Sequence, residues 1–289
     1  MRFGITMLPE YPWAQAAPLW RRAEELGFDH AWTYDHLVWG GLPDSPWYGT
    51  TPTLTAAAMV TSTIRLGTFV TSPNYRHPVT FMRDLLALDD VSGGRFICGI
   101  GAGGDLDSRL LGGPDLSGRE RYERLEEFTV LLDRLLREDH VTSDGTYFSA
   151  RDARTLPGPA RARIPFVMAA NGPRALRLAA RTGQGWVTYG KPGGTYEQWW
   201  DSLREVSARL DDALDAEGRS ADGFERHLNL DPSPFYSLTS VEQFEDAVGR
   251  ASELGFSDLI AHWPRTTDPY GGTVDVLETV ASDVLPRWR

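Results

Sequence analysis

The sequence predicts an α/β fold in which eight pairs of parallel strand and helix close into a (β/α)8 TIM barrel with loop insertions. Short β-branched or aromatic runs alternate with longer amphipathic stretches, which is typical of parallel strands joined by crossover helices. A full set of eight pairs favours a closed barrel over an open doubly wound sheet, which usually has fewer strands. Such a barrel uses about 250 residues as one domain, and no linker or internal repeat interrupts the chain. We therefore expect residues 1–289 to form a single domain.

The strand segments are short apolar runs that end in Gly, Pro or polar turn residues. Their order along the chain predicts the order of the barrel strands. The predicted strands are residues 2–8, 30–35, 64–71, 95–103, 164–170, 185–190, 226–231 and 257–263.

The helices between these strands carry recognisable start and stop residues. Two helical patterns end on Gly27 and Gly255, because glycine readily adopts the left-handed conformation that closes a helix. Asn171 stands before Gly172 and Pro173, and we expect it to cap a helix that begins with the proline.

Two segments do not fit a simple pair of strand and helix. Residues 36–50 are rich in Gly, Pro and Trp. Residues 139–163 are rich in Arg, Pro and turn residues, and they follow the longest helical pattern, residues 121–138. We expect both segments to be loop excursions of the barrel.

Composition limits the partners and the cellular location that we expect for the protein. A net charge of −11 argues against a nucleic-acid partner, because neutralising phosphates requires a basic surface. Cys98 is the only cysteine, which excludes an internal disulfide and a thiolate metal cluster. No stretch reaches the roughly 20 apolar residues of a membrane span, and the N-terminus lacks the apolar core of a signal peptide. We expect a soluble cytoplasmic protein with no membrane partner.

Asp35 and His36 come directly after the second predicted strand. In a parallel barrel the loops after the strands form the active face, so this pair lies where chemistry belongs. Asp35 can accept hydrogen bonds, and His36 can move a proton near neutral pH. The alternative is a polar pair that only caps the strand. Aromatic side chains follow closely and are suited to the floor of a pocket for a flat or apolar ligand; they are Trp39, Trp47 and Tyr48.

The loops after the third and fourth strands add further candidates. Arg76 could bind an anion, and His77 could be a second imidazole of the site; the alternative is that both residues brace the turn in which they lie. Gly101 and Gly103 would let a ring or a phosphate approach the backbone closely. These glycines are not a dinucleotide fingerprint, because the expected βαβ context with an acidic residue about 20 positions on is missing.

The loops after the fifth and sixth strands favour an anion. Backbone N–H groups at the start of the helix opened by Pro173 form a ready anion site. Lys191, the only lysine in the chain, is either a phosphate contact or a solvated loop charge.

The sequence lacks the His-x-His pair of barrel metallohydrolases, the Gly-x-Ser-x-Gly elbow and the phosphate loop, so we expect no metal site. Few candidate side chains other than Asp35 and His36 could act as a general acid or base. The sequence therefore favours a reaction whose difficult chemical step is carried by a bound cofactor.

Three stretches together resemble the bacterial-luciferase-like family of flavin and deazaflavin oxidoreductases. They are "AEELGFDHAWTYDH", "IRLGTFVTSPNYRHPVTFMRDLLALDDVSGGRFICGIGAG" and "NGPRALRLAARTGQGW". The middle stretch is specific, since the spacing from "RLGT" through "RHP" to "SGGR" and the glycine strand matches throughout. The resemblance covers most of the chain and implies a barrel with an insertion that holds FMN or coenzyme F420 at its carboxyl face.

The resemblance also implies roles for individual residues. Asp35 would contact the polar edge of the cofactor ring, and His36 would lie over its reactive centre as the proton-handling residue. A non-proline cis peptide between Phe69 and Val70 would press the backbone against the ring. Lys191 is similar to a lysine that F420-dependent members use for the phosphate, which favours the deazaflavin. The remaining residues expected to bind the cofactor are Gly101, Gly103, Asn171, Gly172 and Pro173.

This chain departs from the family at one catalytic position. F420-dependent members that oxidise sugar phosphates place a glutamate just past the glycine strand, where this chain has Gly104 followed by Asp105. Asp105 can replace that glutamate if the loop lets its carboxylate reach the site.

The first hypothesis is an oxidoreductase that moves a hydride between F420 and a small organic substrate, with His36 as general acid or base. The alternatives are an FMN-dependent monooxygenase that receives reduced flavin from a separate reductase, and a cofactor-binding barrel without catalysis. Family members are often dimers, so the resemblance implies a homodimer. An apolar or aromatic substrate is suggested by Trp39, Trp47, Tyr48, Tyr75 and Trp263.

Overall fold

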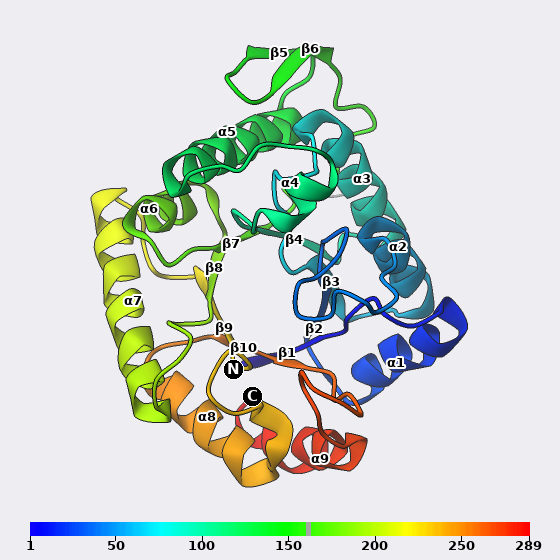
Figure 1. Ribbon diagram of the computed structural model, residues 1–289, viewed down its shortest axis with the longest axis vertical. Helices are drawn as coiled ribbons and strands as arrows, with labels where there is room; N and C mark the ends of the chain where they lie inside the picture. The colour runs from blue at the N-terminus through cyan, green and yellow to red at the C-terminus, as the bar shows by residue number, and fades with distance from the viewer. Residues whose placement is uncertain (160–162) are drawn as a thin grey trace. The chain divides into compact units, whose positions relative to one another are not determined.

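The computed structural model describes residues 1–159 and 163–289, and in them eight strands form a closed parallel barrel with helices between the strands (Figure 1). The order around the barrel is β1-β10-β9-β8-β7-β4-β3-β2. All eight predicted strands are confirmed, each shorter than the predicted run. Their bounds are Arg2–Thr6 (β1), His30–Thr33 (β2), Arg65–Thr68 (β3), Phe96–Ile100 (β4), Phe166–Ala169 (β7), Gly185–Thr188 (β8), Glu225–Asn229 (β9) and Asp258–His262 (β10).

The helices begin and end close to the residues that the sequence indicated. Gly27 and Gly255 have φ values of 82° and 77°, as predicted for glycines that close a helix. Among the described residues, no helix is long and apolar enough to span a bilayer. The helices are Trp13–Glu25 (α1), Thr50–Val60 (α2), Pro78–Val91 (α3), Leu106–Leu110 (α4), Gly118–Arg137 (α5), Pro173–Thr182 (α6), Tyr196–Ala216 (α7), Val241–Glu253 (α8) and Val274–Thr279 (α9).

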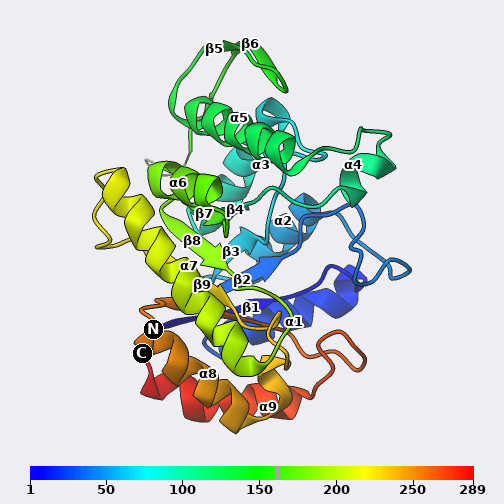
Figure 2. The same cartoon turned by 60° about the vertical axis from the view of Figure 1, so that its left-hand side comes forward.

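The chain divides into two compact units. The first unit comprises Met1–Leu8, Leu19–Trp32 and Val167–Arg289, and the second comprises Pro9–Pro18 and Thr33–Phe166. That residues 1–289 act as one domain stays a prediction. In the first unit α6 packs against α7, and the two chain ends lie side by side (Figures 1 and 2).

The second unit contains both expected loop excursions. Residues 36–49 are loop, as predicted. The prediction for residues 139–163 is wrong over its central part, where β5 (Val141–Asp144) and β6 (Ser149–Ala153) form an antiparallel hairpin beyond α5 (Figure 1). The hairpin forms because the Glu127 carboxylate accepts backbone N–H groups of its turn, at 2.6 to 3.0 Å. Residues 160–162 of this excursion lie outside the described part of the chain.

A buried polar network lies at the amino ends of strands in the first unit. Asp258 accepts from the Arg2 guanidinium at 2.7 and 2.8 Å and from His30 Nε2 at 3.1 Å. Burial opposes ionisation of Asp258, but the attraction of His227, His30 and Arg2 outweighs it and lowers the pKa of the carboxyl. Gly4 leaves room for the His30 ring, since a Cβ there would lie 2.1 Å from His30 Nδ1. At this end of a barrel, such a network serves stability.

The same three groups, His30, His227 and Asp258, offer ligand atoms within 4.8 Å of one another. Their hydrogen bonds oppose metal coordination. Trp32 Nε1 donates to His30 Nδ1 at 2.6 Å, so His30 carries its proton on Nε2 and directs it at Asp258. Both oxygens of Asp258 already accept from Arg2, a cation that would repel a metal ion.

Candidate active site

Candidate residues of the second unit follow the carboxyl ends of β2, β3 and β4. β2 ends at Thr33, and Asp35 and His36 follow it. The peptide bond between Phe69 and Val70, directly after β3, is cis, as the family resemblance predicted. After β4, Gly103 has a φ of 64°, and a Cβ on it would lie 2.5 Å from the amide nitrogen of Asn74. Glycine is required at position 103 because its φ is left-handed and because Asn74 and Ser72 occupy the space of a side chain.

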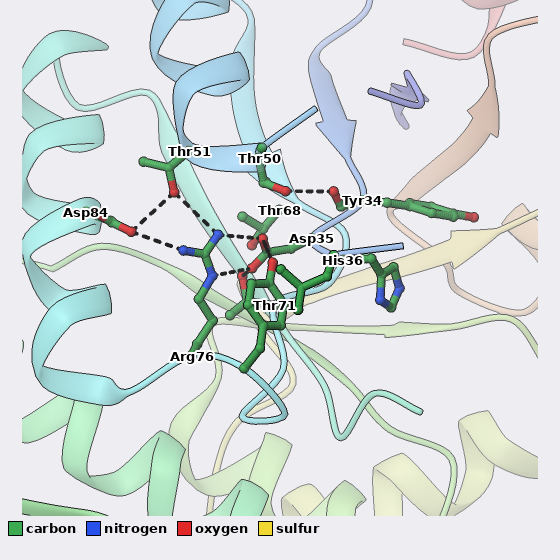
Figure 3. A network of polar contacts seen from close by, with 12 residues as sticks. Tyr34, Asp35, His36, Thr50, Thr51, Thr68, Thr71, Arg76 and Asp84 are labelled. Atoms are coloured by element: carbon green, nitrogen blue, oxygen red, sulfur yellow. Dashed lines mark hydrogen bonds and ion pairs between the residues drawn. The ribbon is translucent and has the colours of Figure 1, made fainter. Parts of the chain in front are cut away.

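Asp35 is fully buried, and its carboxylate points toward Thr71 and Arg76 in the loop after β3 (Figure 3). Thr71 Oγ1 donates to it at 2.6 Å, and Arg76 donates through Nη2 at 2.7 Å and Nε at 3.2 Å. The Tyr75 hydroxyl donates to the other side of the same carboxylate. Burial and the negative charge of Asp35 raise the pKa of Tyr75, so the phenol stays a donor. The contact of Asp35 with a cofactor ring stays a prediction.

Arg76 lies between two carboxylates. Besides Asp35, it contacts Asp84 at 3.2 Å (Figure 3). Burial opposes its charge, but Asp35 outweighs that cost and raises the pKa of Arg76. His77 caps α3 by accepting the N–H of Val79 at 3.2 Å, and burial lowers the pKa of His77. These contacts support the bracing alternative for both residues.

His36 is held differently, because its ring is partly exposed. The side chain is 22% exposed, and its Nδ1 lies 2.7 Å from Asp107 Oδ2. The other oxygen of Asp107 accepts the N–H of Leu37 at 2.7 Å. Trp47 Nε1 donates to the carbonyl of His36 at 2.9 Å, so the backbone is fixed from a second side. His36 thus combines access to solvent with a defined orientation.

Asp107 is the main site residue that sequence reasoning missed. It lies in α4, only two positions after Asp105, and the sequence alone does not indicate which carboxylate meets the histidine. Asp105 instead accepts from Arg121 of α5 at 2.7 Å. A Cβ at Gly104, where the resembling family members carry glutamate, would meet nothing within 4 Å. Because its carboxylate binds Arg121, Asp105 anchors the start of α4. A catalytic role for Asp105 stays a prediction.

Aromatic side chains surround Tyr34, a second residue that the sequence analysis did not single out. Its ring centroid lies 5.2 Å from that of Trp39, 6.4 Å from Trp47 and 6.3 Å from Phe69. Trp39 and Trp47 are 6.3 Å apart, so the structure brings two predicted pocket residues together. Tyr48 is 43% exposed. Tyr75 is occupied with Asp35, as described above, and Trp263 belongs to the first unit.

In the first unit, the prediction that Asn171 caps α6 is wrong. The cap residue is Gly172, and Pro173 is the first residue of the helix. Asn171 instead accepts from Thr188 Oγ1 at 2.6 Å, so its amide ties the end of β7 to the end of β8. A Cβ at Gly172 would meet nothing within 4 Å, which leaves the start of α6 accessible.

Lys191 lies in the loop after β8 and is exposed. Its backbone N–H donates to Ser202 Oγ at 2.9 Å, which fixes the loop while the ammonium group stays at the surface. It borders a surface pocket of about 500 Å³ that Gly193 and Gly194 also line. A phosphate contact of Lys191 stays a prediction.

A second pair of histidine and aspartate lies at the ends of β9 and β10 in the first unit. His262 Nδ1 lies 2.7 Å from Asp231 Oδ2, and the fully buried His262 ring stacks on Tyr270 at 3.8 Å. Tyr236 donates to the His262 carbonyl at 2.7 Å, and burial raises the pKa of Tyr236 together with the charge of Asp231. Because His262 is covered, this cluster supports the loops and does not offer a proton-handling ring.

The sequence model of the luciferase-like monooxygenases matches residues 1–233. An F420-dependent glucose-6-phosphate dehydrogenase of Beutenbergia cavernae is 38% identical, over 92% of this chain and 91% of its own length. An F420-dependent hydroxymycolic acid dehydrogenase of Mycobacterium tuberculosis is 35% identical, over 57% of this chain and 46% of its own. A solved structure of an F420-dependent secondary alcohol dehydrogenase with an F420–acetone adduct is 17% identical, with a TM-score of 0.85 over 100% of this chain and 99% of that one.

The last similarity supports the fold alone, because its sequence identity is low. The family model covers most of the chain, and the first relative is similar over nearly the whole of both sequences. This agrees with the resemblance carried by the strand-two, strand-three and glycine-strand motifs. The chain therefore belongs to the luciferase-like monooxygenase family.

Proposed function

We propose that the protein is an oxidoreductase that transfers a hydride between coenzyme F420 and a small organic alcohol or carbonyl compound. The observation that carries the proposal is His36, a partly exposed imidazole held by a carboxylate at the carboxyl end of a barrel strand. General acid–base catalysis requires such a group within reach of the reacting oxygen. The F420-dependent relatives named above support the choice of reaction class.

In each of the two units, the residues present fit one part of such a cofactor, which has a flat ring and a phosphate-bearing side chain. In the first unit, the open space at Gly172 and the start of the ten-residue helix α6 suit an anion, and Lys191 supplies an exposed cation. In the second unit, a Cβ at Gly104 would meet nothing within 4 Å, so a flat ring can approach the backbone after β4 there. We therefore assign the anion-binding role to Lys191 and Gly172.

His36 moves the proton that accompanies the hydride. When bound, F420 supplies a ring carbon that accepts or donates a hydride. In the oxidising direction, His36 Nε2 accepts the hydroxyl proton of the substrate as the adjacent carbon–hydrogen bond breaks, and a carbonyl compound forms. In the reducing direction, the protonated His36 returns this proton to the carbonyl oxygen. Each direction moves one hydride and one proton, which together are two electrons and two protons.

We assign the substrate to the apolar or aromatic class. Tyr34, Trp39 and Trp47 form an aromatic wall on the loop that carries His36, and Leu37 beside it is 40% exposed. Exposed apolar side chains continue on α4, which holds Asp107, and on the residue that follows it; they are Leu106, Leu110 and Leu111. An apolar surface of this kind favours a substrate that gains from leaving water.

The test is a pair of fluorescence titrations of the purified protein with oxidised F420 and with FMN in the same buffer. We expect tighter binding of F420, weakened by Lys191→Ala and unchanged by Arg21→Ala, which removes one exposed positive charge from α1. Preference for FMN would favour the family's monooxygenase chemistry with a separate reductase. Binding of neither cofactor would reject the proposal.

A substrate screen completes the test. With F420 bound, apolar secondary alcohols or ketones should change the cofactor absorbance faster than sugar phosphates do. Binding of F420 with no turnover of any alcohol or carbonyl would instead favour a cofactor-binding barrel without catalysis. Size-exclusion chromatography with light scattering tests the homodimer.

A further inference from the structure

We propose that Asp107 is the positioning residue of His36, which it holds with the proton on Nδ1 so that Nε2 is the atom that exchanges protons with the substrate. The catalytic consequence of this role rests on the proposed function, whereas the effect of Asp107 on the His36 ring does not.

Asp107 binds two groups of the same short segment. Oδ2 lies 2.7 Å from His36 Nδ1, and Oδ1 lies 2.7 Å from the backbone nitrogen of Leu37. The side chain of Asp107 is 2% exposed, so little water competes for these contacts. One carboxylate thus fixes both the imidazole and the peptide that follows it, and the ring has little freedom to turn.

The hydrogen-bond donors and acceptors around His36 decide which of its two ring nitrogens carries the proton. An ionised carboxylate only accepts hydrogen bonds, and a neutral imidazole has one donor and one acceptor nitrogen. Because Oδ1 of Asp107 accepts from Leu37, Oδ2 is left to accept from His36 Nδ1. The neutral ring then presents the lone pair of Nε2. When a proton arrives at Nε2, the imidazolium lies against the negative charge of Asp107, which stabilises it.

The surrounding contacts hold Asp107 in place. Asp107 lies in α4, whose start is tied to α5 by the ion pair of Asp105 and Arg121 at 2.7 Å. The same helix is closed by the N–H of Gly113, which donates to the Ser108 carbonyl at 2.8 Å. The fold therefore brings a carboxylate from the loop after β4 onto a histidine from the loop after β2. Asp105, where the sequence suggested chemistry, thus has a structural contact, and the carboxylate that meets His36 lies two residues further on.

The first measurement needs no substitution. Nitrogen-15 NMR of the cofactor-free protein distinguishes the two imidazole tautomers, and loss of one resonance in His36→Gln assigns the signal. We expect His36 to be protonated on Nδ1 in its neutral form. A neutral His36 protonated on Nε2 would overturn the proposal, whatever cofactor the protein binds.

The second measurement is Asp107→Asn. Asparagine replaces one of the two carboxylate oxygens by an NH2 group, which donates, so it would oppose the N–H of either His36 or Leu37. We expect kcat to fall by about 100-fold to 10,000-fold, with KM and the dissociation constant of F420 changed less than about threefold, and the His36 tautomer to change with it. The matched control is Asp115→Asn. Asp115 lies in the loop after α4, and its carboxylate is 70% exposed and pairs with Arg109. The kcat of this variant should stay within about twofold of the unsubstituted protein, since exposed ion pairs contribute little.

The outcomes separate the two proposals. An unchanged tautomer and kcat in Asp107→Asn would reject the positioning role even if F420 turnover is established. If F420 does not bind at all, the NMR result still decides the role of Asp107. If Asp107→Asn does not fold, the tautomer of the unsubstituted protein decides it alone.

Discussion

Replacing Arg76 by methionine is expected to lower the free energy of unfolding by about 3 kcal/mol, because it leaves Asp35 as a buried carboxylate without its cation. Asp35 is fully buried, and the side chain of Arg76 is only 17% exposed. Removing one partner of a buried ion pair costs about 3 to 5 kcal/mol. The lower end applies here because the hydroxyls of Thr71 and Tyr75 continue to donate to the carboxylate.

Urea unfolding followed by tryptophan fluorescence measures this effect. The matched control is Arg134→Met, which breaks an exposed pair with Glu138 at 3.3 Å on α5 and should cost less than about 0.5 kcal/mol. Arg76→Lys keeps the charge but loses the fork that reaches Asp35 through two nitrogens, and should lie between the two. If Arg76→Met costs no more than Arg134→Met, the Asp35 network does not stabilise the fold and the reasoning fails.

Three further predictions concern the two ends of the barrel strands. The folded-state pKa of Asp258 is lowered, so its stabilising effect is present above the unfolded pKa of about 3.9 and is lost as pH falls below that value. The unfolding free energy should therefore drop less steeply from about pH 5 to about pH 2 in Asp258→Asn than in the unsubstituted protein; equal slopes would contradict this. Gly4→Ala should cost about 2 to 3 kcal/mol in thermal or urea unfolding because its Cβ meets the His30 ring, whereas Gly104→Ala should be nearly neutral. His36→Ala should lower kcat by about 100-fold or more with F420 affinity retained, and full turnover would remove His36 from the mechanism.

The order of strands and helices could be read from the sequence because it depends on local patterns. Most barrel strands are apolar runs, and glycines such as Gly27 and Gly255 mark helix ends by their own backbone preference. The hairpin at residues 141–153 was missed since its strands are short and mostly polar, and the turn depends on Glu127 from a preceding helix. A contact between separate elements leaves no local pattern.

The candidate site, like the fold, could be predicted from the sequence only in part. The positions of Asp35 and His36 after a strand were evident in the sequence, as was the cis bond through the resemblance at Phe69 and Val70. The sequence did not indicate that the carboxylate of Asp35 is enclosed by residues of the loop after β3, or that Asp107 holds the histidine.

The sequence by itself determined the barrel, its family and the face on which polar residues gather, because periodicity and turn residues act over a few neighbouring positions. Only the tertiary structure decided which carboxylate serves which partner. Asp35, Asp105 and Asp107 are chemically alike, and each acquired its partner from an element far away in the chain: Arg76, Arg121 and His36. Charge pairing depends on distances of a few ångström between loops, and the packing of those loops sets these distances.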